Sequence, residues 1–308
     1  MQDTKIKNQN IFSFLFIFLP LIFTIIGLSF FSYGLVEEHR FILYIPLFSS
    51  LVLLLIGFFL KDKISNILKI MGWMIFSFYW STQINLLYYA EMNDIFNAVM
   101  CVIGVFVLSY LAYHEYLTYN GEKDKTCLDW IAAASAISGL IYFSVELTPL
   151  KDWLIGVVAY QSGLVLNLFL SDVTVDKDLI YCAGRGIISI IFACTAVQSM
   201  VIFVGMILPI PKLEIKRKII GLLITIVPIY FLNLIRNALI AYIVYNDPTQ
   251  FEFAHNILGK GLSLVALIIL LFFVIKMLPE VFDQINCLID LSKRKGPIEK
   301  LFIRKKNK

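Results

Sequence analysis

Long apolar runs separated by short polar breaks dominate the sequence. A membrane-spanning helix needs about 20 mostly apolar residues. Runs near this length predict spans at residues 11–33, 41–60, 68–89, 94–113, 129–148, 189–210, 219–241 and 257–278. The first run is too long for a signal-peptide core and lacks a convincing small-residue cleavage site, so we interpret it as a span. The pattern predicts an all-α polytopic membrane bundle of about eight transmembrane helices.

Two stretches between the fifth and sixth predicted spans depart from this pattern. Residues 153–170 are apolar enough to cross, but Gln161, Gly163 and Asn167 interrupt them. A crossing here would invert everything after it, so we predict a re-entrant or interfacial helix on the outer side. The following residues, 172–186, combine valines with turn residues and predict an outer loop or a small hairpin.

The C-terminal tail has its own periodicity. Between Glu280 and Ser292, apolar residues recur at helical spacing and basic residues follow them. This predicts an amphipathic helix on the cytoplasmic face, with lipid headgroups as partners of its lysines. We therefore predict one membrane domain in three parts: five N-terminal spans in residues 1–150, a catalytic core in 151–280 and a cytoplasmic basic tail in 281–308.

The composition supports a membrane protein, and the positions of the charged residues orient its predicted spans. Of the 308 residues, 59% are hydrophobic and 16% are charged, and the mean hydropathy is +0.83. This excludes an ordinary soluble domain, whose surface must face water. In an eight-span arrangement the basic residues between spans fall on one side: Lys5, Lys7, Lys61, Lys63, Lys69, Lys123, Lys125, Lys212, Lys216, Arg217, Lys218 and the tail from Lys293 onward. The positive-inside rule makes that side cytoplasmic, so both termini are predicted to lie inside.

The cysteines are scattered through the chain, at Cys101, Cys127, Cys182, Cys194 and Cys287. Without paired CxxC spacing they indicate neither a zinc site nor a disulfide scaffold. We expect no metal and no cofactor.

Three reactive side chains reach a similar depth near the outer side of this topology. Cys194 lies about one turn inside the sixth span, and His255 lies just before the eighth. Arg236 lies roughly 25 Å from the inner edge of the seventh, at about 1.5 Å per residue. Taken singly, Arg236 also fits a snorkelling residue, Cys194 a small hydrophobe and His255 an interfacial polar residue. Their common depth favours one site, since an arginine within a membrane needs a partner.

This set supports nucleophilic catalysis by a thiolate. Arg236 would stabilise the thiolate form of Cys194 and the oxyanion of a tetrahedral intermediate. His255 would protonate a leaving amine and then deprotonate an incoming nucleophile. The three side chains predict acyl transfer at the outer membrane surface.

Three short blocks resemble the signatures of the exosortase and archaeosortase family. They are Ala193 to Ser199 (ACTAVQS), Asn233 to Asn237 (NLIRN) and the Ala254–His255–Asn256 triplet. The resemblance covers roughly residues 150–295. The tail from Leu278–Pro279–Glu280 through Asp290–Leu291 to Gly296–Pro297 is most similar to the archaeosortase A branch.

The resemblance implies a membrane-embedded cysteine transpeptidase. Its substrates would be secreted surface proteins ending in a PGF-type motif, a hydrophobic helix and a basic tail. A thioester on Cys194 would pass the protein to an amine on a membrane lipid, and water as acceptor would give a protease instead. The expected partners are these C-terminal tails and the lipid, with no nucleic acid.

The resemblance also assigns residues. It implies Cys194 as the nucleophile and Arg236 as the essential arginine, and leaves the third position open between His255 and Asn256. Five further polar residues of the blocks are expected to bind substrate: Thr195, Ser199, Asn233, Asn237 and Asn256.

Two other classes of protein remain open from the residues alone. Pro20, Pro228 and the interrupted 153–170 stretch could line the path of a small-solute transporter, although no paired halves are apparent. A non-catalytic membrane scaffold belongs with that reading. A thiol-redox protein is the other class, because Cys182 and Cys194 are both predicted near the outer face, and spacing does not decide whether they pair.

Overall fold

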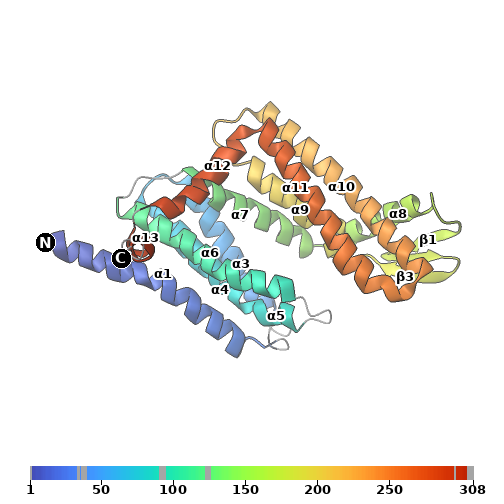
Figure 1. The fold of residues 1–308 in the computed structure, drawn as a ribbon, viewed down its shortest axis with the longest axis horizontal. Helices are drawn as coiled ribbons and strands as arrows, with labels where there is room; N and C mark the ends of the chain where they lie inside the picture. The colour runs from blue at the N-terminus through green and yellow to red at the C-terminus, as the bar shows by residue number, and fades with distance from the viewer. Residues whose placement is uncertain are drawn as a thin grey trace. The chain divides into compact units, whose positions relative to one another are not determined.

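A computed structural model of the protein describes residues 2–32, 35, 40–89, 95–121, 126–294 and 296–303. The described chain is mostly α-helical (Figure 1), as predicted for an all-α membrane bundle. It divides into two compact units, of which unit 1 comprises Met1–Ala136 with Gln284–Lys308 and unit 2 comprises Ile137–Asp283. The structure thus groups the tail with the N-terminal helices, whereas the sequence pattern sets it apart.

Unit 1 is built from closely packed helices: α1 (Gln2–Phe30), α3 (Arg40–Phe59), α4 (Lys63–Thr82), α5 (Ile84–Tyr88), α6 (Ile95–Tyr119), the start of α7 (Thr126–Glu146), the end of α12 (Pro279–Ile289), η4 (Asp290–Lys293) and α13 (Pro297–Ile303). Glycines permit the close approach. A Cβ atom at Gly72 of α4 would lie 2.9 Å from Cγ of Leu54 on α3. Leu54 belongs to a buried cluster with Trp73 and Leu108, which joins α3, α4 and α6.

A disulfide between Cys127 and Cys287 fastens the start of α7 to α12, with the two Cα atoms 5.8 Å apart. The sequence analysis, which found no sign of a disulfide scaffold, was wrong about this pair. Their separation of 160 residues leaves no local spacing pattern from which the contact could be read.

Unit 2 combines helices with a small sheet: α8 (Leu150–Leu166), β1 (Val173–Asp176), β2 (Leu179–Cys182), β3 (Arg185–Ser189), η1 (Phe192–Thr195), α9 (Val197–Ile207), α10 (Ile215–Asn246), η2 (Pro248–Gln250), η3 (Phe253–Gly259) and α11 (Lys260–Met277). The strands are antiparallel in the order β1-β2-β3, with Val175 opposite Ile180 and Ile180 opposite Ile188. The hairpin predicted for 172–186 is therefore present, with a third strand added.

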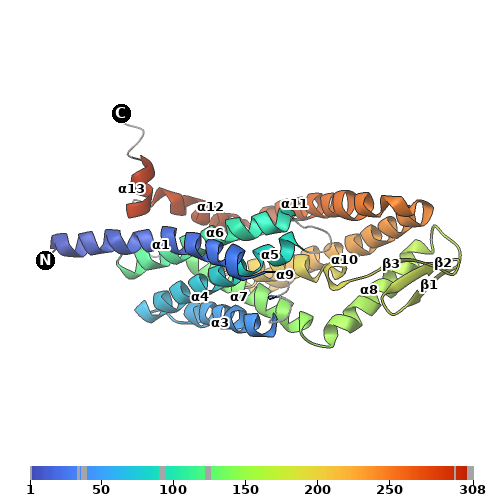
Figure 2. The ribbon, with the colours of Figure 1, turned by 90° about the horizontal axis from the view of Figure 1, so that it is seen from below.

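The sheet packs against α8, the helix predicted for residues 153–170. A Cβ atom at Gly163 would lie 2.5 Å from Cγ2 of Val175, so only glycine allows this contact. Figures 1 and 2 show α8 and the strands beside the end of α10 from which the chain continues toward α11. A buried cluster that includes Val158, Ile180 and Ala241 joins α8, the sheet and α10.

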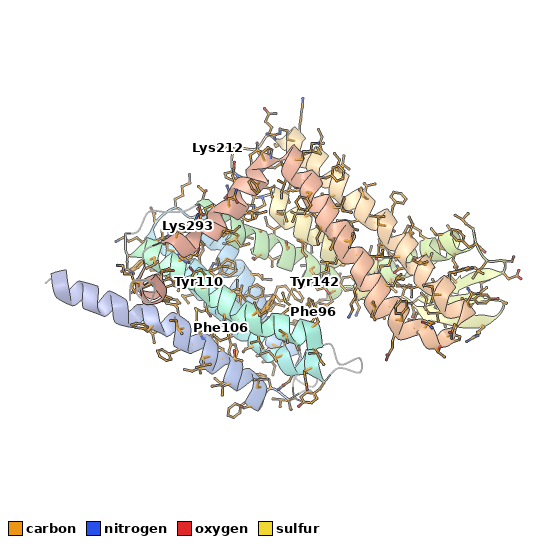
Figure 3. The ribbon with its side chains drawn as sticks, in the orientation of Figure 1. Phe96, Phe106, Tyr110, Tyr142, Lys212 and Lys293 are labelled. Carbon is orange, nitrogen blue, oxygen red and sulfur yellow. A yellow bond between two sulfur atoms is a disulfide. The ribbon has the colours of Figure 1, made fainter. Side chains whose placement is uncertain are left out.

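Apolar side chains cover the outside of many helices, as expected where lipid replaces water. In Figure 3, Phe96 and Phe106 stand out along α6, and their exposed fractions are 73% and 40%. Among the described residues, six helices are long and apolar enough to cross a membrane: 12–30, 41–59, 95–119, 126–146, 215–246 and 253–277.

The described chain contains six such helices, whereas the sequence predicts eight, and the difference arises at two of the predicted spans. The predicted span 68–89 corresponds to α4 and α5, which break at Gln83. The predicted span 189–210 is only partly helical, because it begins in β3 and η1 and continues as α9, which has 11 residues. At about 1.5 Å per residue, α9 reaches roughly half of a hydrocarbon core about 30 Å thick.

Candidate active site

Cys194 lies in a tight backbone turn rather than within a long span. It is part of the 3₁₀ helix η1, and its amide donates to the carbonyl of Ile191 at 2.8 Å. The Thr195 hydroxyl donates to the carbonyl of Phe192 at 2.7 Å. Ala196 then adopts a left-handed conformation, with φ 62° and ψ 7°. This conformation is strained for a residue with a side chain, and such residues cluster at functional sites.

Two asparagines of α10 hold the carbonyl oxygen of Cys194. Nδ2 of Asn233 donates to it at 2.7 Å, and Nδ2 of Asn237 donates to it at 3.1 Å. The Asn237 amide also lies 3.4 Å from Oγ of Ser162 on α8. All three polar side chains are buried, so the turn that carries the thiol is attached to two helices from inside the unit.

Arg236 lies between these asparagines in sequence and faces a neighbouring side of α10. The residue is half-buried, and its Nε atom is buried without a hydrogen-bond partner among the described residues. It packs against η3, because a Cβ atom at Gly259 would lie 3.0 Å from this Nε. A guanidinium with an unpartnered N–H group is suited to bind an anion or a developing negative charge.

His255 lies in η3, a segment of π-helix that leads into α11. Its ring stacks on Phe251, with centroids 5.6 Å apart and planes inclined by 8°. Short π-helical segments occur frequently at functional sites. The side chain of Asn256, the other candidate for the third position, lies outside the described residues.

The structure therefore gathers the three sequence blocks around α10. Cys194, Leu234, Ile240 and Ala254 share one buried cluster, with members from η1, α10 and η3. All the candidate catalytic residues belong to unit 2.

Several residues predicted to bind substrate have partners inside the protein. Asn233 and Asn237 bind the Cys194 carbonyl, and Thr195 binds its own turn. Ser199 instead lines an apolar groove of about 160 Å³ between α9 and α11. Contact with substrate stays a prediction for these residues.

Residues that the sequence analysis missed complete the polar face of α10. Ser162 contacts Asn237, and the Tyr230 hydroxyl donates to Oε1 of Gln161 at 2.6 Å. A signal was present, because polar residues at 230, 233 and 237 recur at helical spacing in an otherwise apolar run. Such residues often join helices across a membrane bundle.

The second outer cysteine, Cys182, has a different setting. It lies in β2, where its Sγ is 3.4 Å from the carbonyl oxygen of Ser171. Both Cys182 and Cys194 carry free thiols in the described chain, with no disulfide between them. Within that part of the chain, no group of three or more His, Cys, Asp and Glu side chains is arranged to hold a metal ion.

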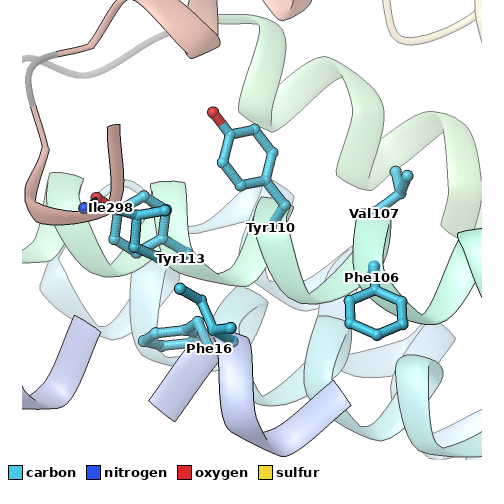
Figure 4. Close-up of a pocket in the computed structure, with 7 residues that line it drawn as sticks. Phe16, Phe106, Val107, Tyr110, Tyr113 and Ile298 are labelled. Atoms are coloured by element: carbon cyan, nitrogen blue, oxygen red, sulfur yellow. Dashed lines mark hydrogen bonds between the residues drawn. The ribbon is translucent and has the colours of Figure 1, made fainter. Parts of the chain in front are cut away.

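A larger cavity, of about 320 Å³, lies in unit 1 (Figure 4). Its lining is apolar and aromatic: Phe16, Ile17, Phe106, Val107, Tyr110, Tyr113 and Ile298. None of the candidate site residues contributes to it, so cavity size does not locate the chemistry in this protein.

Comparisons with known proteins agree with these blocks. The family model described as transmembrane exosortase (Exosortase_EpsH) matches residues 51–273. Archaeosortase A of Natronomonas pharaonis is 25% identical over 247 residues, covering 69% of this chain and 76% of the relative. Archaeosortase A of Haloferax volcanii is 24% identical over 254 residues, covering 70% and 81%. A probable archaeosortase E of Methanocaldococcus jannaschii is 27% identical over 141 residues, covering 46% and 74%. No solved structure matches the chain.

Proposed function

The chain belongs to the transmembrane exosortase family, and we propose that it is a cysteine transpeptidase that sorts surface proteins at the membrane. Its substrates would carry a C-terminal PGF-type motif, a hydrophobic helix and a basic tail. The curated relatives named archaeosortase A support this substrate class.

One observation carries the proposal. The backbone of Cys194 is bound to Asn233 and Asn237, the residues that flank Arg236 on the same helix. A free thiol and a guanidinium with an unpartnered N–H group thus belong to two hydrogen-bonded elements of unit 2, η1 and α10. A transporter or a scaffold has no need for this arrangement.

The reaction would begin with attack of the Cys194 thiolate on the scissile carbonyl. Two features would stabilise negative charge that develops during the attack: the Arg236 guanidinium and the N-terminus of α9, which begins at Val197, three residues after Cys194. Arg236 would also stabilise the oxyanion of the tetrahedral intermediate.

Collapse of that intermediate breaks the C–N bond, leaves a thioester on Cys194 and releases the tail. His255 would donate the proton that the leaving amine needs and then accept one from the amine of a membrane lipid. Attack by that amine on the thioester forms the new amide and returns the thiolate.

We propose that this site faces outward and that both termini lie in the cytoplasm. The support is the distribution of basic residues, since Lys212 before α10, the first turn of α10 and the tail are all basic. A substrate inserted with its basic tail inside would then present its motif on the same outer side as Cys194.

The test is processing of a surface protein that carries the tripartite tail, co-expressed with this chain. Cys194→Ala and Cys194→Ser are expected to leave full-length precursor, while Cys182→Ala serves as the matched control and processes normally. The mass of the mature C-terminus separates lipid transfer from hydrolysis. Normal processing by Cys194→Ala would overturn the enzyme assignment, and equal loss with Cys182→Ala would favour the thiol-redox class.

A further inference from the structure

The carbonyl oxygen of Cys194 accepts two side-chain hydrogen bonds from one helix. The Asn233 and Asn237 amides both donate to it, at 2.7 and 3.1 Å, one for each lone pair. The two residues are separated by one helical turn, so their side chains form a pair on a single face of α10. Such a pair fixes both the direction of the carbonyl and the rotation of the helix about its axis.

We call the two asparagine amides that bind the Cys194 carbonyl the clamp. The strained backbone at Ala196, which follows the carbonyl, suggests what the clamp is for. Ala196 holds a left-handed conformation without being glycine, and its carbonyl accepts the Met200 amide within α9. A strained turn persists only where its surroundings determine it. The two amides bind the carbonyl two residues before Ala196, at the point where the strained turn would otherwise relax.

Ser162 extends the clamp to a second helix. Its hydroxyl oxygen lies 3.4 Å from the Asn237 amide, and the side chain is fully buried in α8. The adjacent Gly163 packs directly against Val175 of the sheet, so α8 itself is held in place at this level. The Asn237 amide therefore lies between two fixed oxygen atoms.

We propose that Ser162, Asn233 and Asn237 are positioning residues that aim the Cys194 thiol relative to Arg236. This rests on the proposed function for its consequence in catalysis. They act through the backbone of Cys194 rather than by touching substrate. The clamp also fixes α10, on which Arg236 follows Asn233 by three residues, so the nucleophile and the cation share one support.

The experiment compares catalysis with thiol accessibility in the full-length protein in detergent. For Asn237→Ala and Asn233→Ala, kcat is expected to fall about 10- to 100-fold while KM changes less than about twofold, because misplacement of the nucleophile affects the chemical step. Alkylation of Cys194 by iodoacetamide, followed by mass spectrometry of its peptide, is expected to become at least about threefold faster, because the buried turn opens.

Opposite changes in the two rates are the signature of lost positioning. Asn246→Ala is the matched control, since that exposed asparagine of α10 donates only to the Tyr242 carbonyl in the described chain; neither rate should change. Unaltered kcat and alkylation in Asn233→Ala/Asn237→Ala would overturn the proposal.

Two further arms keep the outcome decisive. If the asparagine variants fail to fold, Ser162 provides the alternative test. Ser162→Ala is expected to lower kcat about threefold, whereas Ser162→Thr keeps the hydroxyl and should keep the kcat of the wild type. Equal activity in the two variants would refute the clamp. The alkylation rate is measured without substrate. The clamp therefore remains testable even if normal processing by Cys194→Ala overturns the proposed transpeptidase function.

Discussion

In unit 1 buried ionisable groups pair with one another, whereas in unit 2 buried polar groups bind the backbone next to a free thiol. Nζ of Lys69 lies 2.5 Å from Oδ1 of Asp129 and 3.1 Å from Oε2 of Glu115, and Lys69 and Glu115 are fully buried. This triad joins α4, α6 and α7, and its two carboxylates share the single ammonium group of Lys69.

The C-terminal tail shows the same behaviour in unit 1. Oε2 of Glu299 accepts from the Tyr113 hydroxyl at 2.9 Å, and Arg294 donates to the His114 carbonyl at 3.0 Å. Both charged residues are buried. Part of the tail that the sequence predicts to rest on lipid headgroups is therefore packed against α6.

Unit 2 leaves its reactive groups available. The Arg236 Nε atom has no hydrogen-bond partner among the described residues, and the Cys194 thiol is free while its carbonyl is held twice. Closed ion pairs indicate a structural role, whereas a half-buried cation with a buried, unpartnered N–H group indicates a ligand that arrives later. The comparison predicts that charge removal affects stability in unit 1 and catalysis in unit 2.

The largest expected effect is on catalysis, from Arg236→Ala. Loss of the guanidinium removes a donor from the developing oxyanion, so kcat should fall at least about 100-fold while the free energy of unfolding changes by less than about 1 kcal/mol. Arg217→Ala is the matched control, because that arginine pairs with Glu280 at the surface of the same unit. Substrate processing and thermal unfolding measure the two quantities. Full activity in Arg236→Ala would remove our account of how the thiolate is stabilised.

A smaller effect on activity and a large one on stability are expected from Lys69→Ala. The substitution removes the cation that pairs with the buried Glu115 carboxylate, which should destabilise unit 1 by about 3 to 5 kcal/mol. The kcat of the folded fraction should stay within about twofold of the wild type. Chemical unfolding in detergent reports the stability. Lys293→Ala removes an exposed pair with Asp290 and should cost less than about 1 kcal/mol. A selective loss of kcat in Lys69→Ala would break the division between the units.

Hydrophobic periodicity sufficed to predict most of this fold. The apolar runs located the long helices, and the valine-rich 172–186 segment located the hairpin, because both patterns follow from burial alone. The short α9 could not be predicted in this way. Residues 189–196 are mostly apolar, like the helical segments, and the turn that contains Cys194 is bound by asparagines about 40 residues later.

The candidate site was predictable only in part. The blocks at 193–199, 233–237 and 254–256 suggested the family, and that assignment is confirmed by the match over residues 51–273. Their polar residues were expected to touch substrate, yet side chains of Asn233 and Asn237 point at the Cys194 backbone. Ser162 lies outside all three blocks, so only the packing of α8 against α10 reveals it.

The smallest expected effect comes from an ion pair of unit 2 that resembles the triad of unit 1 in chemistry but not in burial. Nη1 and Nη2 of Arg217 donate to the two carboxylate oxygens of Glu280 at 2.5 and 3.1 Å, and both side chains are more than one-third exposed. These hydrogen bonds lower the pKa of Glu280 below its ordinary value of 4.5.

The sign of the pH dependence follows from that shift. A carboxylate with a lower pKa in the folded state stabilises the protein above its unfolded pKa, and this stabilisation disappears as pH falls through the folded value. Glu280→Gln should therefore lower the free energy of unfolding by less than about 1 kcal/mol at pH 7, because water screens the pair, and by a smaller amount at pH 3. Chemical unfolding at both pH values measures the difference in free energy of unfolding between the wild type and Glu280→Gln, and Arg217→Ala/Glu280→Gln is the control. A difference as large as that expected for Lys69→Ala would show that burial does not separate the two kinds of ion pair.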